Sequence, residues 1–261
     1  MYKTLKLDIY DNMAIINLTA QQKYNAYDNA MAIDLLRAFE EVEKIKDIRA
    51  VLLRATGKAF CVGGDINMFA EKMDHMPADI PDMMEVLNTT ITTMINLSKP
   101  ILVAVHGAVA GVGLSLMLAC DLAIAANSTK FTLAYSELGV TPDGGATYLL
   151  PRIVGMRKAM QMILLPEIFN ADKALQLGLV NWVVDETELN EQAMLLINKL
   201  ADGPSIAYRR AKELINHTWQ RTLDNQLMTE MHAFTECTTT QDFRRGVTAF
   251  LNKSKPSFTG N

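Results

Sequence analysis

The chain has 261 residues, of which 49% are hydrophobic and 21% charged, so it can bury a large core and falls outside the composition of disordered proteins. Its formal net charge of −4 gives no basic field for nucleic acid or acidic lipid, and we expect neither partner. Three cysteines form no CxxC pair and no closed disulfide set, and the amino terminus has no apolar signal core. We therefore expect a cytoplasmic protein.

The first third of the chain predicts a hairpin followed by a strand-helix-strand unit. Residues 5–9 and 14–18 predict two short strands around an Asp-Asn turn, which is typical of a β-hairpin. Residues 28–46 predict a helix capped by aspartate, and residues 49–55 predict a buried strand. Residues 68–81 lack periodicity and predict a mobile loop or short helix. Residues 81–97 have helical spacing and predict a further helix.

Residues 101–126 are almost wholly apolar and long enough to cross a bilayer. Three glycines would interrupt a spanning helix, and His106 and Asp121 would be costly in lipid, so we do not expect a membrane segment. The pattern favours a buried strand at 101–105, a glycine turn, a buried helix and a second strand at 122–126.

Amphipathic helices dominate the rest of the chain, apart from a strand signal at 180–184. The expected helices span residues 188–201, 205–216, 223–235 and 241–251. We therefore expect an α/β core over residues 1–200 and a helical region over residues 201–261.

Three glycine-containing turns follow strand-like segments, at residues 60–65, 106–113 and 142–145. Glycine at such junctions lets main-chain N–H groups point at an oxyanion, although it is also ordinary turn chemistry. The dinucleotide fingerprint, the GK[ST] phosphate loop, the GxSxG elbow and metal-ligand spacings are all missing. We expect no metal site, and Ser115 and His106 are interpreted as packing residues.

Residues 57–66, Gly-Lys-Ala-Phe-Cys-Val-Gly-Gly-Asp-Ile, resemble the G-x-AF-(C/S)-x-G-x-D-(L/I) segment of the crotonase (enoyl-CoA hydratase/isomerase) superfamily. Residues 106–121 resemble its second signature, and residues 131–151 resemble its third. The resemblance extends from the opening hairpin to Phe258. It implies a crotonase fold, with a spiral core of repeated β-β-α units and a carboxy-terminal helical trimerisation region, and hence a homotrimer or hexamer.

The same resemblance implies an acyl-CoA thioester substrate and no separate cofactor. By position, the main-chain N–H groups of Gly64 and Val112 would hold the thioester oxygen while it gains negative charge. Hydratases of the superfamily use two glutamates, and the matching positions here are Ser115 and Tyr135, whose hydroxyls are poor bases near neutral pH.

Asp143 is the carboxylate that remains at a matching position. Taken alone, it is interpreted as the N-cap of the next helix. Several isomerases of the superfamily carry their acting aspartate there, and the chain most resembles the 1,2-epoxyphenylacetyl-CoA isomerase and Δ3,Δ2-enoyl-CoA isomerase branch. We expect an isomerase with Asp143 as acid and base, and Glu137 in a structural or solvent-facing place. Enoyl-CoA hydratase and a catalytically silent scaffold remain as alternatives.

Residues expected to contact the substrate are Lys23, Ala26, Asp65, Ile66, Asn67, Met68, Ser115, Tyr135 and Phe258. The resemblance assigns Lys23 and Ala26 to the nucleotide part of coenzyme A, residues 64–67 to the pantetheine path and Phe258 to the adenine region. Lys23 fits a solvated surface lysine equally well. Residues 68–76, rich in methionine, form a candidate acyl pocket or simply fill core space.

Overall fold

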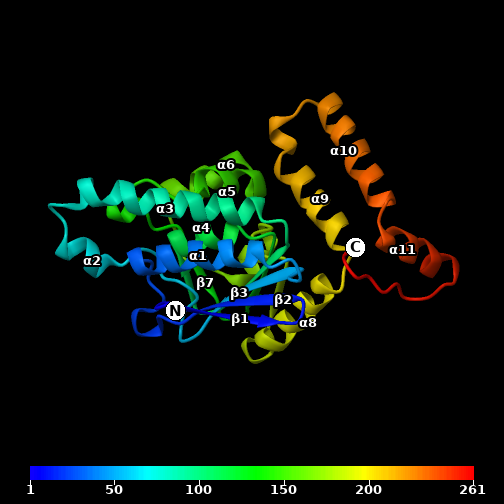
Figure 1. Cartoon of the computed structure of the whole chain (residues 1–261). Helices are drawn as coiled ribbons and strands as arrows, with labels where there is room; N and C mark the ends of the chain where they lie inside the picture. Colours follow the sequence, from blue (N-terminus) through cyan, green and yellow to red (C-terminus); the bar gives the residue numbers. More distant parts are fainter.

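The computed structural model describes residues 1–261 (Figure 1). Its main sheet has six strands in the order β1-β2-β3-β4-β6-β9. These strands are β1 (Leu5–Tyr10), β2 (Met13–Leu18), β3 (Ala50–Ala55), β4 (Ile101–Val105), β6 (Leu122–Ala126) and β9 (Trp182–Val184). The first two strands form the expected antiparallel hairpin, and every later pairing in this sheet is parallel.

A second sheet of three short strands runs beside the first, in the order β5-β7-β8. Its strands are β5 (Ala108–Ala110), β7 (Lys130–Thr132) and β8 (Phe169–Asn170). One turn of chain contributes β4 to the main sheet, β5 to the second sheet and then helix α4 (Val112–Leu118). The next turn repeats this order with β6, β7 and helix α5 (Ala146–Val154). The predicted crotonase fold of repeated β-β-α units is therefore confirmed.

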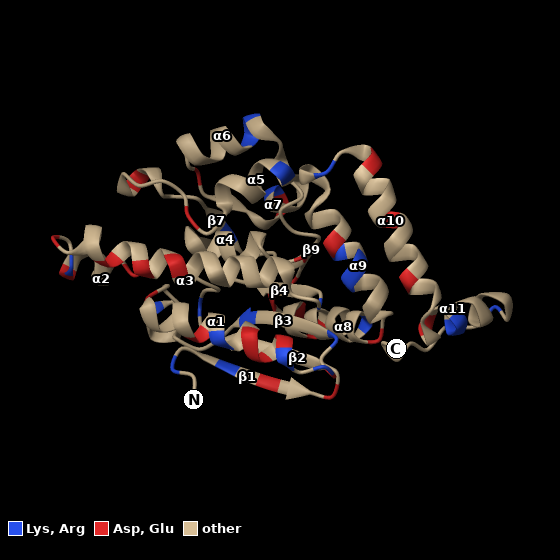
Figure 2. Cartoon of the chain, turned by 45° about the horizontal axis from the view of Figure 1, so that its top comes forward, with Lys and Arg blue, Asp and Glu red and all other residues tan.

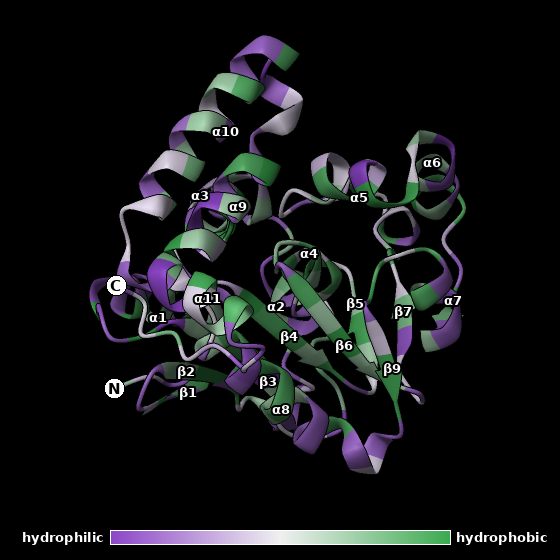
Figure 3. Ribbon diagram, turned by 90° about the vertical axis from the view of Figure 1, so that its right-hand side faces the viewer, coloured by the Kyte–Doolittle hydropathy of each residue, from purple (hydrophilic) through white to green (hydrophobic).

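Helices cover both faces of the main sheet. Helices α1 (Asn29–Lys44) and α3 (Met76–Asn96) lie on one face, and α8 (Leu189–Ala201) lies on the other (Figure 1). Because side chains alternate along a strand, Val51 and Leu53 pack into the larger core with α1 and α3, whereas Ala50 and Leu52 pack against α8. Figure 3 shows β4 and β6 as strongly hydrophobic strands, as expected for strands covered on both faces.

Asp28 begins α1 as predicted, because its side chain accepts a hydrogen bond from the Met31 amide at 2.9 Å. The stretch expected as a mobile loop or short helix is mostly helical, in agreement with the second alternative. It holds helix α2 (Ile66–Glu71) and the first turns of α3, which starts at Met76 rather than at Pro81. Asp65 caps α2, and Pro77 lies in the first turn of α3, where a missing N–H costs no intrahelical bond.

Residues 101–126 form the predicted strand, glycine turn, helix and strand, with the short β5 as an addition. No helix in the structure combines the length and the apolar character that crossing a membrane requires. The last strand begins later than predicted, at Trp182. Charged residues are unevenly distributed over the helices: those of α3 and α10 (Leu223–Thr238) are all acidic, whereas α9 (Ser205–Asn216) carries both signs (Figure 2).

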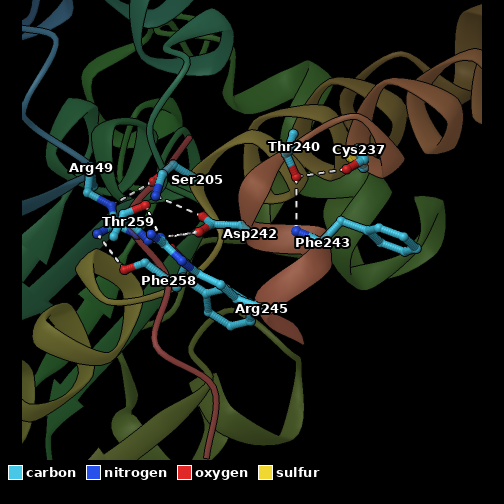
Figure 4. Close-up of polar contacts among 11 residues, drawn as sticks. Arg49, Ser205, Cys237, Thr240, Asp242, Phe243, Arg245, Phe258 and Thr259 are labelled. Atoms are coloured by element: carbon cyan, nitrogen blue, oxygen red, sulfur yellow. Dashed lines mark hydrogen bonds and ion pairs between the residues drawn. The ribbon is translucent and has the colours of Figure 1, made fainter. Parts of the chain in front are cut away.

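The predicted carboxy-terminal helices are confirmed, and α9 to α11 stand away from the sheet (Figure 1). The remaining helices are α6 (Met156–Leu164), α7 (Ala171–Gln176), α9 (Ser205–Asn216), α10 (Leu223–Thr238) and α11 (Gln241–Leu251). Arg49 donates to Ser205 Oγ at 2.8 Å and to the Phe258 carbonyl at 3.3 Å (Figure 4). Buried Asp242 accepts from the Thr259 amide at 2.8 Å. These contacts fasten the carboxy-terminal tail beside the start of β3.

A buried lysine fastens α9 to the core. Lys212 Nζ donates to Asp121 Oδ2 at 2.8 Å and to the carbonyls of Met94 and Lys99 at 3.0 and 3.3 Å. Asp121 also accepts from the Ile101 amide at 2.7 Å. Burial raises the pKa of Asp121, and Lys212 opposes that shift.

We predict that Lys212→Met destabilises the protein by roughly 1 kcal/mol at pH 7 in urea unfolding, because it leaves the partly exposed Asp121 carboxylate without its cation. A raised carboxyl pKa makes the ionised form the unfavourable one in the folded state. The loss should therefore shrink as the pH falls toward about 4, where the unfolded aspartate also becomes protonated. Lys46→Met, at an exposed lysine without an ion pair, is the control. Equal stability of the two variants at pH 7 would contradict the prediction.

Candidate active site

Two chain segments run side by side at the centre of the molecule. Cys61 forms a parallel bridge with Val109. The Cys61 amide donates to the Ala108 carbonyl at 3.2 Å, and the Cys61 carbonyl accepts from the Ala110 amide at 2.9 Å. Three residues beyond this bridge, the two segments reach Gly64 and Val112. The fold therefore brings the two predicted oxyanion donors to the same level of adjacent segments.

Glycine is required where these segments meet. Gly111 has φ +50°, and a Cβ placed there would lie 3.4 Å from the Gly63 Cα. A Cβ at Gly113 would lie 2.5 Å from the Cys61 carbonyl oxygen, which is closer than atoms can approach. The glycines singled out in the sequence thus permit close approach of two backbones.

The main-chain N–H groups of Gly64 and Val112 are both available to a ligand. The Gly64 amide has no hydrogen-bond acceptor in the structure. Val112 is the first residue of α4, so its amide has no partner within the helix, and the amides of Leu114 and Ser115 both turn back to the Gly111 carbonyl. A pair of free main-chain donors is what stabilisation of an enolate oxygen needs.

Ser115, Tyr135 and Asp143 form a hydrogen-bonded cluster. The Tyr135 hydroxyl donates to Asp143 Oδ1 at 2.6 Å and lies 3.1 Å from Ser115 Oγ. Ser115 Oγ donates to the Asp143 main-chain carbonyl at 3.0 Å. The Tyr135 ring packs close to Gly111, since a Cβ added to this glycine would lie 3.8 Å from Tyr135 Cζ. Tyr135 therefore lies between Asp143 and the segment that carries the Val112 amide.

Local electrostatics separate the roles of Asp143 and Tyr135. Burial raises the pKa of Asp143 above its usual value, while the hydrogen bond from Tyr135 partly offsets the rise. Burial and the charge of Asp143 raise the pKa of Tyr135 well above its ordinary value, so this hydroxyl keeps its proton. Tyr135 is therefore a donor, and Asp143 is a carboxylate whose proton affinity is higher than usual.

Asp143 is not a helix cap. The N-cap of α5 is Gly145, with φ +76°, and no side chain caps this helix. The interpretation of Asp143 from local sequence alone is thus wrong, because the glycine pair turns the chain before the helix starts and leaves the aspartate facing Tyr135. Glu137, the neighbouring carboxylate, is exposed, in agreement with the prediction.

The loop before α1 and the start of α2 are joined by an ion pair. Lys23 Nζ lies 3.0 Å from Asp65 Oδ2 and 3.4 Å from Asp28 Oδ2. Asp65 accepts from the amides of Asn67 and Met68 at 3.1 and 3.3 Å. Burial would raise the pKa of Asp65, but the bonds from Lys23 and these amides hold it below its usual value. The Asp65 side chain therefore holds the loop and helix together, and Lys23 remains 55% exposed.

The other predicted contact residues lie in different surroundings. Ala26 is buried, Ile66 and Asn67 are exposed, and Met68 is half-buried. Phe258 belongs to the carboxy-terminal tail. In space, this tail lies on the opposite side of the molecule from α2 (Figure 1). One chain therefore does not bring Phe258 to the other predicted contacts.

Sequence reasoning missed one residue beside the donors. Tyr27 is 1% exposed and forms a parallel bridge with Gly64. The phenylalanine of the predicted acyl pocket, Phe69, also lies there, because a Cβ on Gly64 would be 2.9 Å from its ring. No local signal distinguishes Tyr27 from a core tyrosine. No cluster of three or more His, Cys, Asp or Glu side chains is arranged to hold a metal ion.

Comparisons with known proteins agree with this geometry. The chain matches the family described as Enoyl-CoA hydratase/isomerase over residues 8–261. It is 36% identical to 1,2-epoxyphenylacetyl-CoA isomerase of Escherichia coli K12, with 94% of each chain covered. It is 34% identical to a Rhodobacter capsulatus protein named "Probable enoyl-CoA hydratase", with 99% of each chain covered.

A solved structure of an enoyl-CoA hydratase from Polaromonas sp. JS666 superposes with a TM-score of 0.92 at 30% identity, covering 97% of this chain and 99% of that one. The similarity thus spans the sheets, the donor segments and the carboxy-terminal helices together. The chain belongs to the enoyl-CoA hydratase/isomerase family of the crotonase fold.

Proposed function

We propose that the protein is an acyl-CoA thioester isomerase. The observation that carries this proposal is the half-buried Asp143, the carboxylate in the Ser115–Tyr135–Asp143 cluster, with its pKa raised and its orientation fixed by Tyr135. Asp143 removes a proton from one carbon of the acyl chain and returns it to another. The amides of Gly64 and Val112 hold the enolate oxygen between the two steps.

The chemistry balances without an added reactant. The electron pair of the broken C–H bond moves into the enolate, the double bond shifts, and the proton returns from Asp143, so product and substrate have equal mass. For an epoxide thioester, the same aspartate assists ring expansion. The relative named 1,2-epoxyphenylacetyl-CoA isomerase supports this class of reaction.

Hydration is the alternative, and the names of hydratase relatives keep it open. It requires a base for water and an acid for the substrate carbon. The positions matching the two hydratase glutamates carry Ser115 and Tyr135, and the raised pKa of Tyr135 makes it unfit as a base. A catalytically silent scaffold is the third possibility.

For coenzyme A, we propose a path along Lys23, Ala26 and residues 65–68. The exposed ammonium of Lys23, which lies beside the first turn of α2, fits an anionic phosphate. The three cysteines are unpaired in the structure, which is compatible with the proposed cytoplasmic location.

We also propose a homotrimer or a hexamer. Leu223, Leu227, Met231 and Phe234 are each at least 51% exposed and follow one another along α10 at helical spacing. This stripe exposes apolar side chains that a single chain leaves uncovered.

The assembly proposal predicts a mass of three or six chains in light scattering. Phe234→Glu places a charge in the apolar stripe of α10 and should shift the population toward smaller species. Circular dichroism must show unchanged helix content in the variant. A wild-type protein that stays monomeric over a wide concentration range would refute the assembly.

The proposed activity predicts a specific outcome with a panel of acyl-CoA thioesters that includes β,γ-enoyl and aromatic epoxide thioesters. Ultraviolet absorbance should change while the product mass stays constant in H₂¹⁸O. A gain in mass equal to one labelled water would identify a hydratase instead. No turnover of any thioester, with binding retained, would favour the scaffold.

Asp143→Asn is predicted to lower the isomerisation rate by about a hundredfold to ten-thousandfold, because asparagine still accepts from Tyr135 but is no base. Acyl-CoA binding should persist. Glu137→Gln, which neutralises the nearby exposed carboxylate, is the matched control and should keep the wild-type rate.

The stability of Asp143→Asn provides a second measurement. A raised folded-state pKa means that ionised Asp143 lowers stability above its ordinary pKa of about 3.9. The variant should therefore unfold at an equal or higher urea concentration at pH 7, with no gain below about pH 4. Normal isomerisation by Asp143→Asn together with a slow Glu137→Gln would assign the base to Glu137.

A further inference from the structure

Tyr27 lies beside the oxyanion donors, buried in the large core. Its amide donates to the Gly63 carbonyl at 2.7 Å, and its carbonyl accepts from the Asp65 amide at 3.0 Å. Tyr27 and Gly64 are paired as a parallel bridge, and residues paired in this way direct their side chains to the same face. The Tyr27 ring therefore leaves the chain on the face where Gly64 has no side chain.

The Tyr27 hydroxyl is buried, yet no protein group lies within hydrogen-bonding distance of it. Buried hydroxyls almost always have a hydrogen-bond partner, so an unpaired one needs an explanation. The contrast with Tyr135 is direct, since the Tyr135 hydroxyl is held by both Asp143 and Ser115. Tyr27 is the aromatic hydroxyl of the site that remains free to bind something else.

The surroundings of the Tyr27 hydroxyl keep it a hydrogen-bond donor. Burial raises the pKa of Tyr27 well above its ordinary value, and the charge of Asp143 raises it further. The hydroxyl therefore stays protonated near neutral pH. A protonated phenol without an acceptor can be satisfied by an oxygen that enters with the substrate.

The thioester oxygen already has its two donors in Gly64 and Val112, and Asp143 already has Tyr135. In the proposed site, the acyl carbons next to the thioester lie between the Gly64 amide and Asp143. A saturated or olefinic hydrocarbon chain offers no acceptor there, whereas a hydroxyl or epoxide oxygen on its β or γ carbon does.

We propose that Tyr27 is a specificity-determining residue that donates a hydrogen bond to an oxygen on the β or γ carbon of the acyl group. The preferred substrates are then oxygen-bearing acyl-CoA thioesters, such as epoxides, rather than all-carbon enoyl thioesters. This assignment rests on the proposed acyl-CoA site and deepens it. A hydrocarbon ligand leaves a buried hydroxyl unpaired, so discrimination of roughly 5- to 150-fold is expected from one such bond.

The test measures dissociation constants by calorimetry for butyryl-CoA, 3-hydroxybutyryl-CoA in both enantiomers, and 4-hydroxybutyryl-CoA. Wild-type protein should bind at least one hydroxylated thioester more tightly than butyryl-CoA. Tyr27→Phe should reduce that preference by about 5- to 150-fold. Tyr24→Phe is the matched control, because Tyr24 is 49% exposed in the same loop, and it should keep the wild-type preference.

Thermal unfolding without ligand gives an independent readout. Removing an unpaired hydroxyl should leave the melting temperature of Tyr27→Phe unchanged or higher. A clear fall would show that the hydroxyl is engaged in the free protein, and would overturn the proposal. An unchanged ligand preference, or equal weakening of all the thioesters, would also overturn it. If the preference depends on Tyr27 but no thioester is isomerised, the isomerase proposal fails and the Tyr27 assignment stands.

Discussion

The parallel bridge between Cys61 and Val109, with the close approach of the chain on either side of it, is the constraint on which the rest of the site depends. It requires backbones so close that a Cβ at Gly107 would lie 1.9 Å from the Lys58 carbonyl oxygen. Any side chain there would force the segments apart and separate the amides of Gly64 and Val112. Donors fixed by the fold need no reorganisation when charge develops, which is why rigid backbone is suited to holding an enolate.

The surroundings of the Asp143 side chain set its proton affinity. Burial disfavours its charge, and the hydrogen bond from Tyr135 favours it, so the pKa of Asp143 is raised and the carboxylate is a stronger base than an exposed aspartate. Ser115 holds the main chain of Asp143, which keeps the side chain directed toward Tyr135. Ser115 and Tyr135 thus both form hydrogen bonds with Asp143, so Ser115 does more than fill space in an apolar helix.

Periodic signals predicted most of the fold, because alternation and helical spacing are local properties of the chain. The start of α3 was missed, since Pro81 looked like a helix start although Pro77 precedes it in the first turn. The family resemblance assigned the candidate donors to Gly64 and Val112, and the glycine turns pointed to the same segments. The environment of Asp143 was not predicted, because its bond to Tyr135 depends on how the glycine turn at Gly145 redirects the chain. Tyr27 was missed because burial and a free hydroxyl leave no mark in the sequence.

Overall similarity does not decide between isomerase and hydratase, since relatives with both kinds of name share this chain's length and fold. The donors do not decide it either, because both reactions pass through charge on the thioester oxygen. The difference lies in how many groups must move protons. Hydration activates water at one carbon and protonates another, whereas a double-bond shift lets one carboxylate remove a proton and return it. A cluster with Asp143 as its carboxylate, and with Ser115 and Tyr135 committed to hydrogen bonds with it, supports the one-base reaction.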